Sequence, residues 1–310
     1  MHHYGVRIEP LRTTPDPAPA PAPTPAYPLQ PLLHLDELWI QVAGTLCNLS
    51  CTHCFVSSGP GIDRHRLMSR AEVHSRVLEA LPLGVKEFYF TGGEPFVHPE
   101  LLEILEDTLA HGPCTVLTNG TLLTEARIRS LRRLSEGTRY SLEIRVSLDG
   151  ASPAEHDRLR GPGVFARALD GLLRLERAGL LPIVTITRPV EHDPLAFHER
   201  ALLMLRAAGL SRPRLKVIPM FLIGRERQRT RGYRGEESLR DLPAESFDPG
   251  RLQCSRCRAV TSQGVFVCPL LVDEPGGRMG DRLGDAVRPF ELRHGACFTC
   301  WTTGMSCGNS

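Results

Sequence analysis

CNLSCTHC, residues 47–54, holds three cysteines that are separated by three and then by two residues. A loop this short can turn the thiols of Cys47, Cys51 and Cys54 toward one inorganic centre. An iron–sulfur cubane normally takes four cysteine thiolates, and no fourth cysteine lies near this loop in the sequence. One iron of a cubane bound here would therefore be free to bind a small molecule. The alternative is a structural zinc site, although zinc sites usually use paired C-x2-C motifs.

Strand and helix patterns alternate from residue 37 to residue 224. Strands are expected at 38–43, 86–90, 115–117, 142–149, 183–187 and 215–219, and helices at 70–81, 98–111, 124–135, 164–178 and 195–208. Such alternation builds a parallel sheet with right-handed crossovers. Six units are too few for a closed eight-unit barrel. The fold class expected is therefore α/β, a partial (β/α)6 barrel.

Polar and glycine motifs follow the expected strands. Gly92-Gly93-Glu94-Pro95 comes directly after the second strand, and glycine pairs let a backbone approach a ligand closely. Ser147 and Asp149 lie on the polar face of the fourth strand, where a strand buried on both sides should be nearly all apolar. Because the carboxyl ends of such strands meet at one mouth, these residues are expected to line one cavity with the cysteine loop.

These motifs together resemble the radical S-adenosylmethionine (SAM) enzymes. The stretch from Ser147 to Gly161, SLDG…HDRLRG, is similar to the peptide-modifying branches of that family. The resemblance implies that the three-cysteine loop binds a [4Fe-4S] cluster whose open iron chelates SAM, and that an electron from the cluster cleaves SAM to a 5′-deoxyadenosyl radical. It also implies that the SAM pocket includes Gly92, Gly93, Glu94 and Pro95 for the amino group, Ser147 and Asp149 for the ribose and its surroundings, and Arg160 for the carboxylate.

The sequence changes character after residue 224. Residues 225–251 are rich in Arg, Glu, Asp and Gly, which predicts a linker, and residues 252–310 form a Cys-rich domain. A hairpin turning at Gln263-Gly264 is expected between Cys257 and Cys268. Two separated C-x2-C pairs indicate a metal site, zinc or iron–sulfur. The candidate ligands are Cys254, Cys257, Cys268, Cys297, Cys300 and Cys307.

Beside the barrel, this cysteine–hairpin–cysteine layout resembles the SPASM or shorter twitch extension of radical SAM enzymes, which carries auxiliary iron–sulfur clusters. The full SPASM pattern has seven characteristic cysteines and two clusters, and six thiols cannot fill two all-cysteine cubanes. The expectation is one auxiliary [4Fe-4S] cluster, with zinc as the alternative.

Composition limits the other possibilities. Residues 14–31 are dominated by proline and alanine, and residues 1–36 are expected to be a disordered leader. The formal net charge of +2 among 310 residues gives no reason to propose nucleic acid or a membrane surface as partner. No apolar run approaches the roughly 20 residues of a membrane span. Ten cysteines without an export signal favour a reducing compartment, so the expected location is cytoplasmic.

The activity expected from these features is that of a radical SAM oxidoreductase. The adenosyl radical would abstract hydrogen from an unactivated carbon of a peptide or small-molecule substrate. The resemblance implies an external electron donor of the flavodoxin or ferredoxin type. The alternatives are a redox-neutral epimerase or rearrangement enzyme and a non-catalytic iron–sulfur electron carrier. A carrier would need no SAM pocket, so the glycine motif and the polar strand face argue against it.

Overall fold

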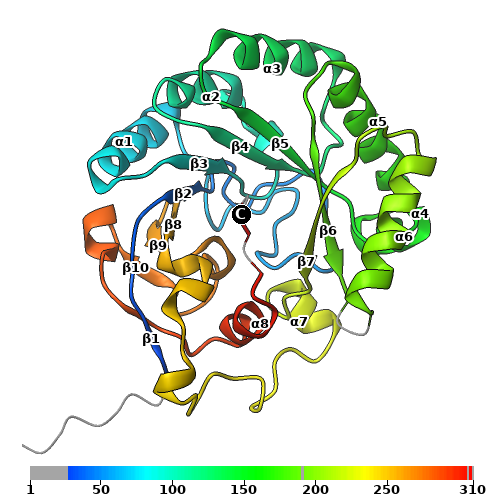
Figure 1. Ribbon diagram of the computed structural model, residues 1–310. Helices are drawn as coiled ribbons and strands as arrows, with labels where there is room; N and C mark the ends of the chain where they lie inside the picture. Colours follow the sequence, from blue (N-terminus) through cyan, green and yellow to red (C-terminus); the bar gives the residue numbers. More distant parts are fainter. Residues whose placement is uncertain (1–26, 190–191, 306, 309–310) are drawn as a thin grey trace, which may run out of the picture.

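The computed structural model describes residues 27–189, 192–305 and 307–308. Nine of its strands form one sheet in the order β10-β9-β8-β2-β3-β4-β5-β6-β7, and Figure 1 shows this sheet curling into an open barrel. The six strands from β2 to β7 are parallel, as the expected fold class requires. They are β2 (Glu37–Ile40), β3 (Glu87–Phe90), β4 (Cys114–Thr118), β5 (Leu142–Ser147), β6 (Ile183–Arg188) and β7 (Arg214–Pro219).

Helices cover the outside of the curved sheet (Figure 1). The helix predicted after Ser69 begins there, because the Ser69 side chain accepts a hydrogen bond from the Glu72 N–H while Glu72 caps Ser69 in return. Helix α5 turns Phe165 and Leu172 inward. The outer helices are α1 (Arg70–Ala80), α2 (Leu101–Leu109), α3 (Glu125–Gly137), α4 (Pro153–Arg160), α5 (Val164–Arg177) and α6 (Pro194–Ala207).

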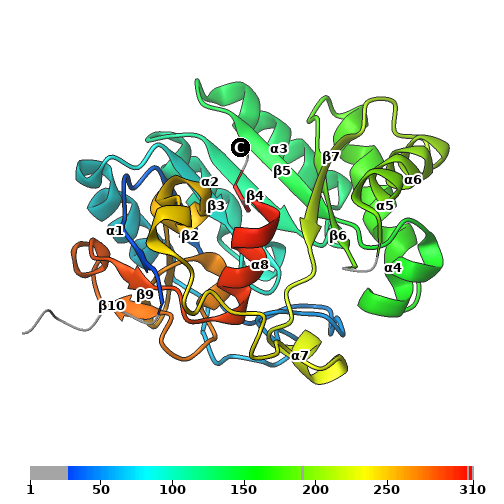
Figure 2. The same cartoon turned by 60° about the horizontal axis from the view of Figure 1, so that its bottom comes forward.

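The Cys-rich region continues the barrel sheet. Strand β8 (Cys257–Thr261) pairs in parallel with β2, and β8 forms the predicted hairpin with β9 (Gly264–Phe266). Strand β10 (Arg278–Gly280) closes this end of the sheet. Helix α8 (Gly295–Thr303) lies between these strands and β7 in Figures 1 and 2. The two predicted regions therefore share one sheet.

Two sequence-based boundaries need correction. Residues 1–26 of the predicted leader lie outside the described residues, but β1 (Leu29–Gln30) pairs with β11 (Phe290–Glu291). The expectation of disorder up to residue 36 is therefore wrong for this strand, which is too short to show a pattern. The predicted linker contains helix α7 (Arg225–Arg229), whose first residue contacts the cysteine loop.

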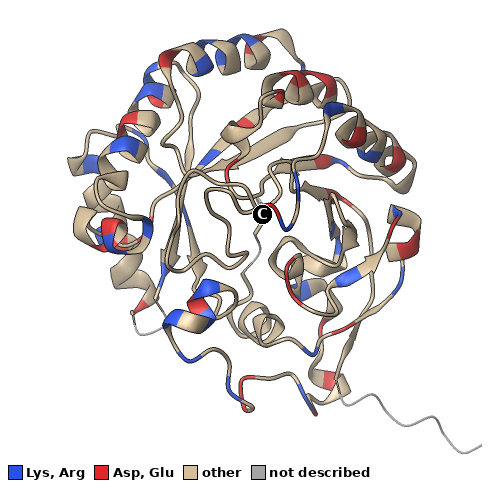
Figure 3. Cartoon of the chain, turned by 180° about the vertical axis from the view of Figure 1, so that it is seen from behind, with Lys and Arg blue, Asp and Glu red and all other residues tan. Residues whose placement is uncertain are grey.

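The outer surface carries both charge signs. Figure 3 shows basic and acidic residues interspersed along the outer helices, which agrees with the small net charge. Among the described residues, every helix is too short or too polar to cross a membrane.

Candidate active site

A cavity of about 180 Å³ lies inside the barrel. Strands β2, β4, β5, β6 and β7 and the cysteine loop all contribute to its wall. The structure brings together most of the residues predicted from the sequence. Those that line the cavity are Cys47, Cys51, Cys54, Gly92, Gly93, Ser147, Asp149 and Arg160.

The cysteine loop presents its three thiols to this cavity. Leu49 N–H points at Cys47 Sγ (3.4 Å) and Ser58 N–H at Cys54 Sγ (3.3 Å). Burial, together with nearby Glu94, raises the pKa of Cys47 to about 12, so without a metal this thiol stays protonated. In the described parts of the chain, no three or more Cys, His, Asp or Glu side chains lie close enough together to hold a metal ion as they stand. The shared cavity and the N–H donors nevertheless fit a cluster held by three thiolates.

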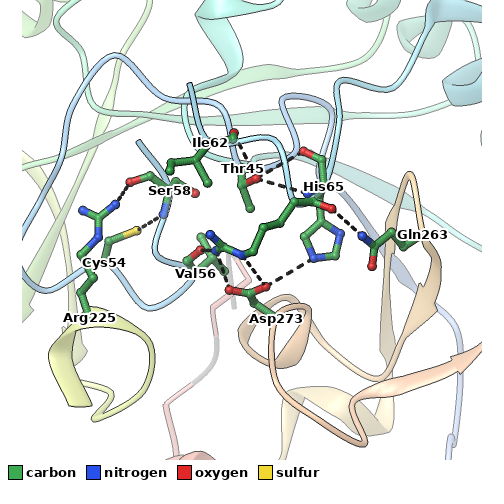
Figure 4. Close-up of polar contacts among 10 residues, drawn as sticks. Thr45, Cys54, Val56, Ser58, Ile62, His65, Arg225, Gln263 and Asp273 are labelled. Carbon is green, nitrogen blue, oxygen red and sulfur yellow. Dashed lines mark hydrogen bonds and ion pairs between the residues drawn. The ribbon is translucent and has the colours of Figure 1, made fainter. Parts of the chain in front are cut away.

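Arg225 fixes the back of this loop. Its Nη1 donates to the carbonyl of Cys51 (2.7 Å), its Nη2 donates to the carbonyl of Ser58, and its backbone N–H donates to the carbonyl of Cys54 (3.0 Å). Figure 4 shows the guanidinium reaching the loop. The sequence analysis missed this residue because it begins a polar stretch without periodicity.

The end of the cysteine loop contacts the region around the β8–β9 hairpin. Arg64 forms an ion pair with Asp273 (2.7 Å) and donates to the carbonyl of Val56 (2.8 Å). The Nδ1 of His65 lies 3.1 Å from Thr261 Oγ1. Figure 4 shows Asp273 of the Cys-rich region contacting His65 beside Val56 of the loop. The loop is therefore clamped from two sides.

Gly93 is required by packing within the site. A Cβ at this position would lie 2.2 Å from the carbonyl oxygen of Leu46 and 2.9 Å from the Cβ of Cys47. Gly92 has φ +133°, which side chains rarely adopt. The sequence argument attributed the glycines to ligand approach, and the structure adds a second reason, since they let this strand end press against the cysteine loop.

Glu94 lies fully buried behind these glycines. Its carboxylate accepts hydrogen bonds from Phe96 N (3.0 Å), Thr118 Oγ1 (2.7 Å) and Asn119 N (2.7 Å). Burial raises its pKa above the usual value, although these hydrogen bonds oppose the change. A nearby cation would favour the ionised form of this carboxyl group. Pro95 begins the 310 turn Pro95–Val97 that presents the Phe96 N–H.

Asp149 is the centre of a buried charge network. Its Oδ2 lies 2.5 Å from Arg160 Nε and 2.8 Å from His53 Nε2, and its Oδ1 accepts from Thr187 N (3.1 Å). Burial alone would raise the pKa of this carboxyl, but Arg160 and His53 outweigh it and hold the pKa well below its usual range. His53 also lines the cavity. Its Nδ1 is buried without a protein hydrogen-bond partner among the described residues.

Two cations lie on strands that contribute to the cavity wall. Arg145, 1% exposed, precedes Ser147 by two residues on β5, and Lys216 lies on β7. Burial and Arg145 lower the pKa of Lys216 to about 8. The sequence analysis did not select Arg145, although it lies two residues before Ser147 in the strand expected at 142–149, and it did not single out Lys216.

The C-terminal cysteines gather beside the barrel. Four of them line a second, small cavity of about 30 Å³: Cys254, Cys268, Cys297 and Cys300. Burial raises the pKa of Cys254 to about 11, and burial together with the nearby Cys254 raises that of Cys268 to about 12. Cys257 is buried on β8, and Cys307 lines the large cavity instead. The six predicted ligands therefore divide into a set of four and two others.

Fold and site define an open-barrel enzyme whose cavity is built on a three-cysteine loop. The family model described as the Radical SAM superfamily matches residues 42–193. This segment of the chain belongs to the superfamily, whose members bind a [4Fe-4S] cluster and SAM. The expectation of a radical SAM enzyme is therefore confirmed.

Curated relatives match this part of the chain. The AdoMet-dependent heme synthase of Methanosarcina barkeri is 36% identical over 142 residues, 45% of this chain and 38% of that protein. Mycofactocin maturase MftC of Mycobacterium tuberculosis is 34% identical over 146 residues, 46% of this chain and 36% of that protein. The matches thus span less than two fifths of these relatives.

Among solved structures, Streptococcus suis SuiB bound to precursor peptide SuiA aligns with a TM-score of 0.58 and 14% identity. The alignment covers 79% of this chain and 61% of that chain. It therefore extends beyond the segment matched by the family model and supports the fold of the barrel.

Proposed function

We propose that this protein is a radical SAM oxidoreductase that abstracts hydrogen from an unactivated carbon of a peptide or small molecule. The observation that carries the proposal is the shared cavity. The three loop cysteines, the glycine pair, Ser147, Asp149 and Arg160 come from four separate chain segments and line one cavity. When bound, a cluster with one open iron supplies the electron that cleaves SAM to a 5′-deoxyadenosyl radical.

The residues of the chain position SAM in this proposal. Cys47, Cys51 and Cys54 hold the cluster, and the N–H groups of Leu49 and Ser58 stabilise the charge on two of the thiolates. The buried carboxylate of Glu94 attracts the SAM ammonium group from behind Gly92 and Gly93, whose backbone forms the wall there.

Asp149 and Arg160 form the opposite side of the proposed SAM pocket. Arg160 keeps guanidinium donors for the SAM carboxylate while its Nε is held by Asp149. Ser147 lies next to them on β5, within the same wall, and serves the ribose. Because the Asp149–Arg160 pair is buried, its geometry is fixed before SAM binds.

The Cys-rich region is proposed to hold one auxiliary [4Fe-4S] cluster. The four cysteines around the small cavity, Cys254, Cys268, Cys297 and Cys300, are the number that a closed cubane takes. A structural zinc ion takes the same number of thiolates. Sulfide content of the reconstituted protein separates these two cases.

A peptide is one of the two proposed substrate classes. The structure of SuiB, which shares the barrel, contains a precursor peptide, and a bacteriocin subtilosin biosynthesis protein of Bacillus subtilis is 30% identical over 143 residues. An external flavodoxin- or ferredoxin-type donor would supply the electron. The redox-neutral alternative, an epimerase or rearrangement enzyme, would use the same pocket.

The test is anaerobic reconstitution followed by incubation with SAM and dithionite. We expect 5′-deoxyadenosine and methionine to form, and the Cys51→Ala variant to form neither. Cleavage that persists in Cys51→Ala, or no cleavage by the parent protein with its cluster present, would reject the proposal.

A further inference from the structure

A row of polar side chains crosses three adjacent strands that contribute to the cavity wall. The Cα atoms of Ser147, Thr185 and Lys216 are register partners across β5, β6 and β7, so their side chains point to the same face of the sheet. Ser147 and Thr185 line the cavity. Arg145 lies on the same face, two residues before Ser147, and its Nε and Nη2 both contact Thr185 Oγ1 at 3.3 Å.

The chain's own carbonyl oxygens occupy this row. Arg145 Nη1 donates to the carbonyl of Cys307 (2.5 Å), and Lys216 Nζ donates to the carbonyl of Gly308. The N–H of Cys307 donates to Gln253 Oε1 (2.6 Å). Two cations thus bind two consecutive carbonyl groups. The oxygen atoms of a ligand would be held at the same position.

We propose that Arg145 and Lys216 form a carboxylate-binding subsite of the substrate cavity, in which the carbonyls of residues 307–308 stand in for the ligand. The inference rests on the proposed function, because it takes this cavity to be the substrate site. A carboxylate forms charge-assisted hydrogen bonds that are about twice as strong as those of a neutral carbonyl. It therefore competes successfully with the two backbone groups for these donors.

Of the two cations, Lys216 gives the stronger reason to expect an anionic ligand. Among the described residues no carboxylate lies within 4 Å of its ammonium group, whereas fourteen other Lys and Arg side chains have a carboxylate oxygen within 2.8 Å. A partly buried ammonium without an anion is costly. The chain has only two lysines among its 37 basic residues, and the other, Lys86, pairs with Asp36 on the surface.

The test is calorimetric titration of the reconstituted, SAM-loaded full chain with two probes. The probes are N-acetyl-Gly-Gly with a free carboxylate and the same dipeptide with an amidated end. We expect the free acid to bind at least tenfold more tightly, about 1.4 kcal/mol. Lys216→Met should remove this difference, Lys216→Arg should retain it, and the matched control Lys86→Met should leave it unchanged.

A second measurement needs no substitution. Amine-reactive labelling of the parent protein, read by mass spectrometry, should show that the free acid slows the modification of Lys216 but not of Lys86, while the amide slows neither. Equal binding of both probes, no binding of the acid at concentrations of about 10 mM, or unchanged labelling of Lys216 would overturn the proposal. SAM cleavage measured on the same preparation reports separately on the proposed function, since probe binding does not require it.

Discussion

Replacing Gly93 with alanine should disrupt the cluster site through a single methyl group. The new Cβ would lie 2.2 Å from the carbonyl oxygen of Leu46, and an ordinary contact needs 3.4 Å or more. The peptide between Leu46 and Cys47 must therefore move by about 1.2 Å, because the methyl meets backbone rather than a flexible side chain. Overpacking of this kind costs about 1–3 kcal/mol.

For cluster binding, the displacement of the Leu46–Cys47 peptide matters more than the cost in folding free energy. Metal–ligand distances tolerate deviations of about 0.2 Å, and Cys47 moves with the displaced peptide. We expect Gly93→Ala to lose SAM-site iron while the auxiliary site keeps its metal. The assay combines iron and sulfide analysis of the reconstituted protein with the SAM-induced change in the EPR spectrum of the reduced cluster.

Gly137→Ala is the matched control for this experiment. A Cβ at Gly137 meets no atom within 4 Å, and the residue ends helix α3. It should keep full iron content and SAM cleavage. If Gly93→Ala also keeps full iron content and the SAM-induced spectral change, the packing argument is refuted.

Three further predictions concern the rest of the site. Asp149→Asn should lower the free energy of unfolding by about 3–5 kcal/mol, because it leaves Arg160 buried without its anion. Since the pKa of Asp149 is depressed, this loss is complete above about pH 4 and fades as the pH falls further, through the folded-state pKa; urea unfolding at several pH values measures it. Arg225→Met removes two charged hydrogen bonds worth roughly 1.5–3 kcal/mol each, so a chelator should extract loop iron at least tenfold faster. Cys268→Ser should lower auxiliary iron, whereas Cys257→Ser should not, as metal analysis of each variant will show.

Each of these predictions has an outcome that contradicts it. A pH-independent loss in Asp149→Asn would mean that charge pairing is not the cause. Unchanged iron release in Arg225→Met would mean that the clamp on the loop is redundant. Equal auxiliary iron in the two serine variants would place the cluster ligands elsewhere among the six cysteines.

Local signals in the sequence were sufficient for much of the barrel. The capping box at Ser69, the period-2 alternation of residues 142–149 and the hairpin at Gln263-Gly264 each lie within a few residues, and the structure has the expected elements there. The spacing of the loop cysteines led to the family for the same reason.

Contacts between distant segments were not accessible in this way. The pairing of β8 with β2 joins residues 220 positions apart along the sheet register, from Glu37 to Cys257. No local pattern marks Arg225 as a partner of the cysteine loop or Lys216 as a partner of Gly308. These residues became candidates only when the fold placed them beside one another.

The position of β2 between β3 and β8 has a consequence for how the chain folds. The cysteine loop directly follows strand β2, yet β8, one of the two neighbours of β2, is synthesised much later, since Cys257 lies 220 residues after its register partner Glu37. Long-range parallel pairing is slow to form because the loop-closure entropy comes first. Until β8 arrives, β2 is an unpaired edge that invites association with other chains. Cluster insertion is therefore expected to follow the synthesis and pairing of β8, and chains truncated before residue 257 should aggregate rather than assemble a metal site.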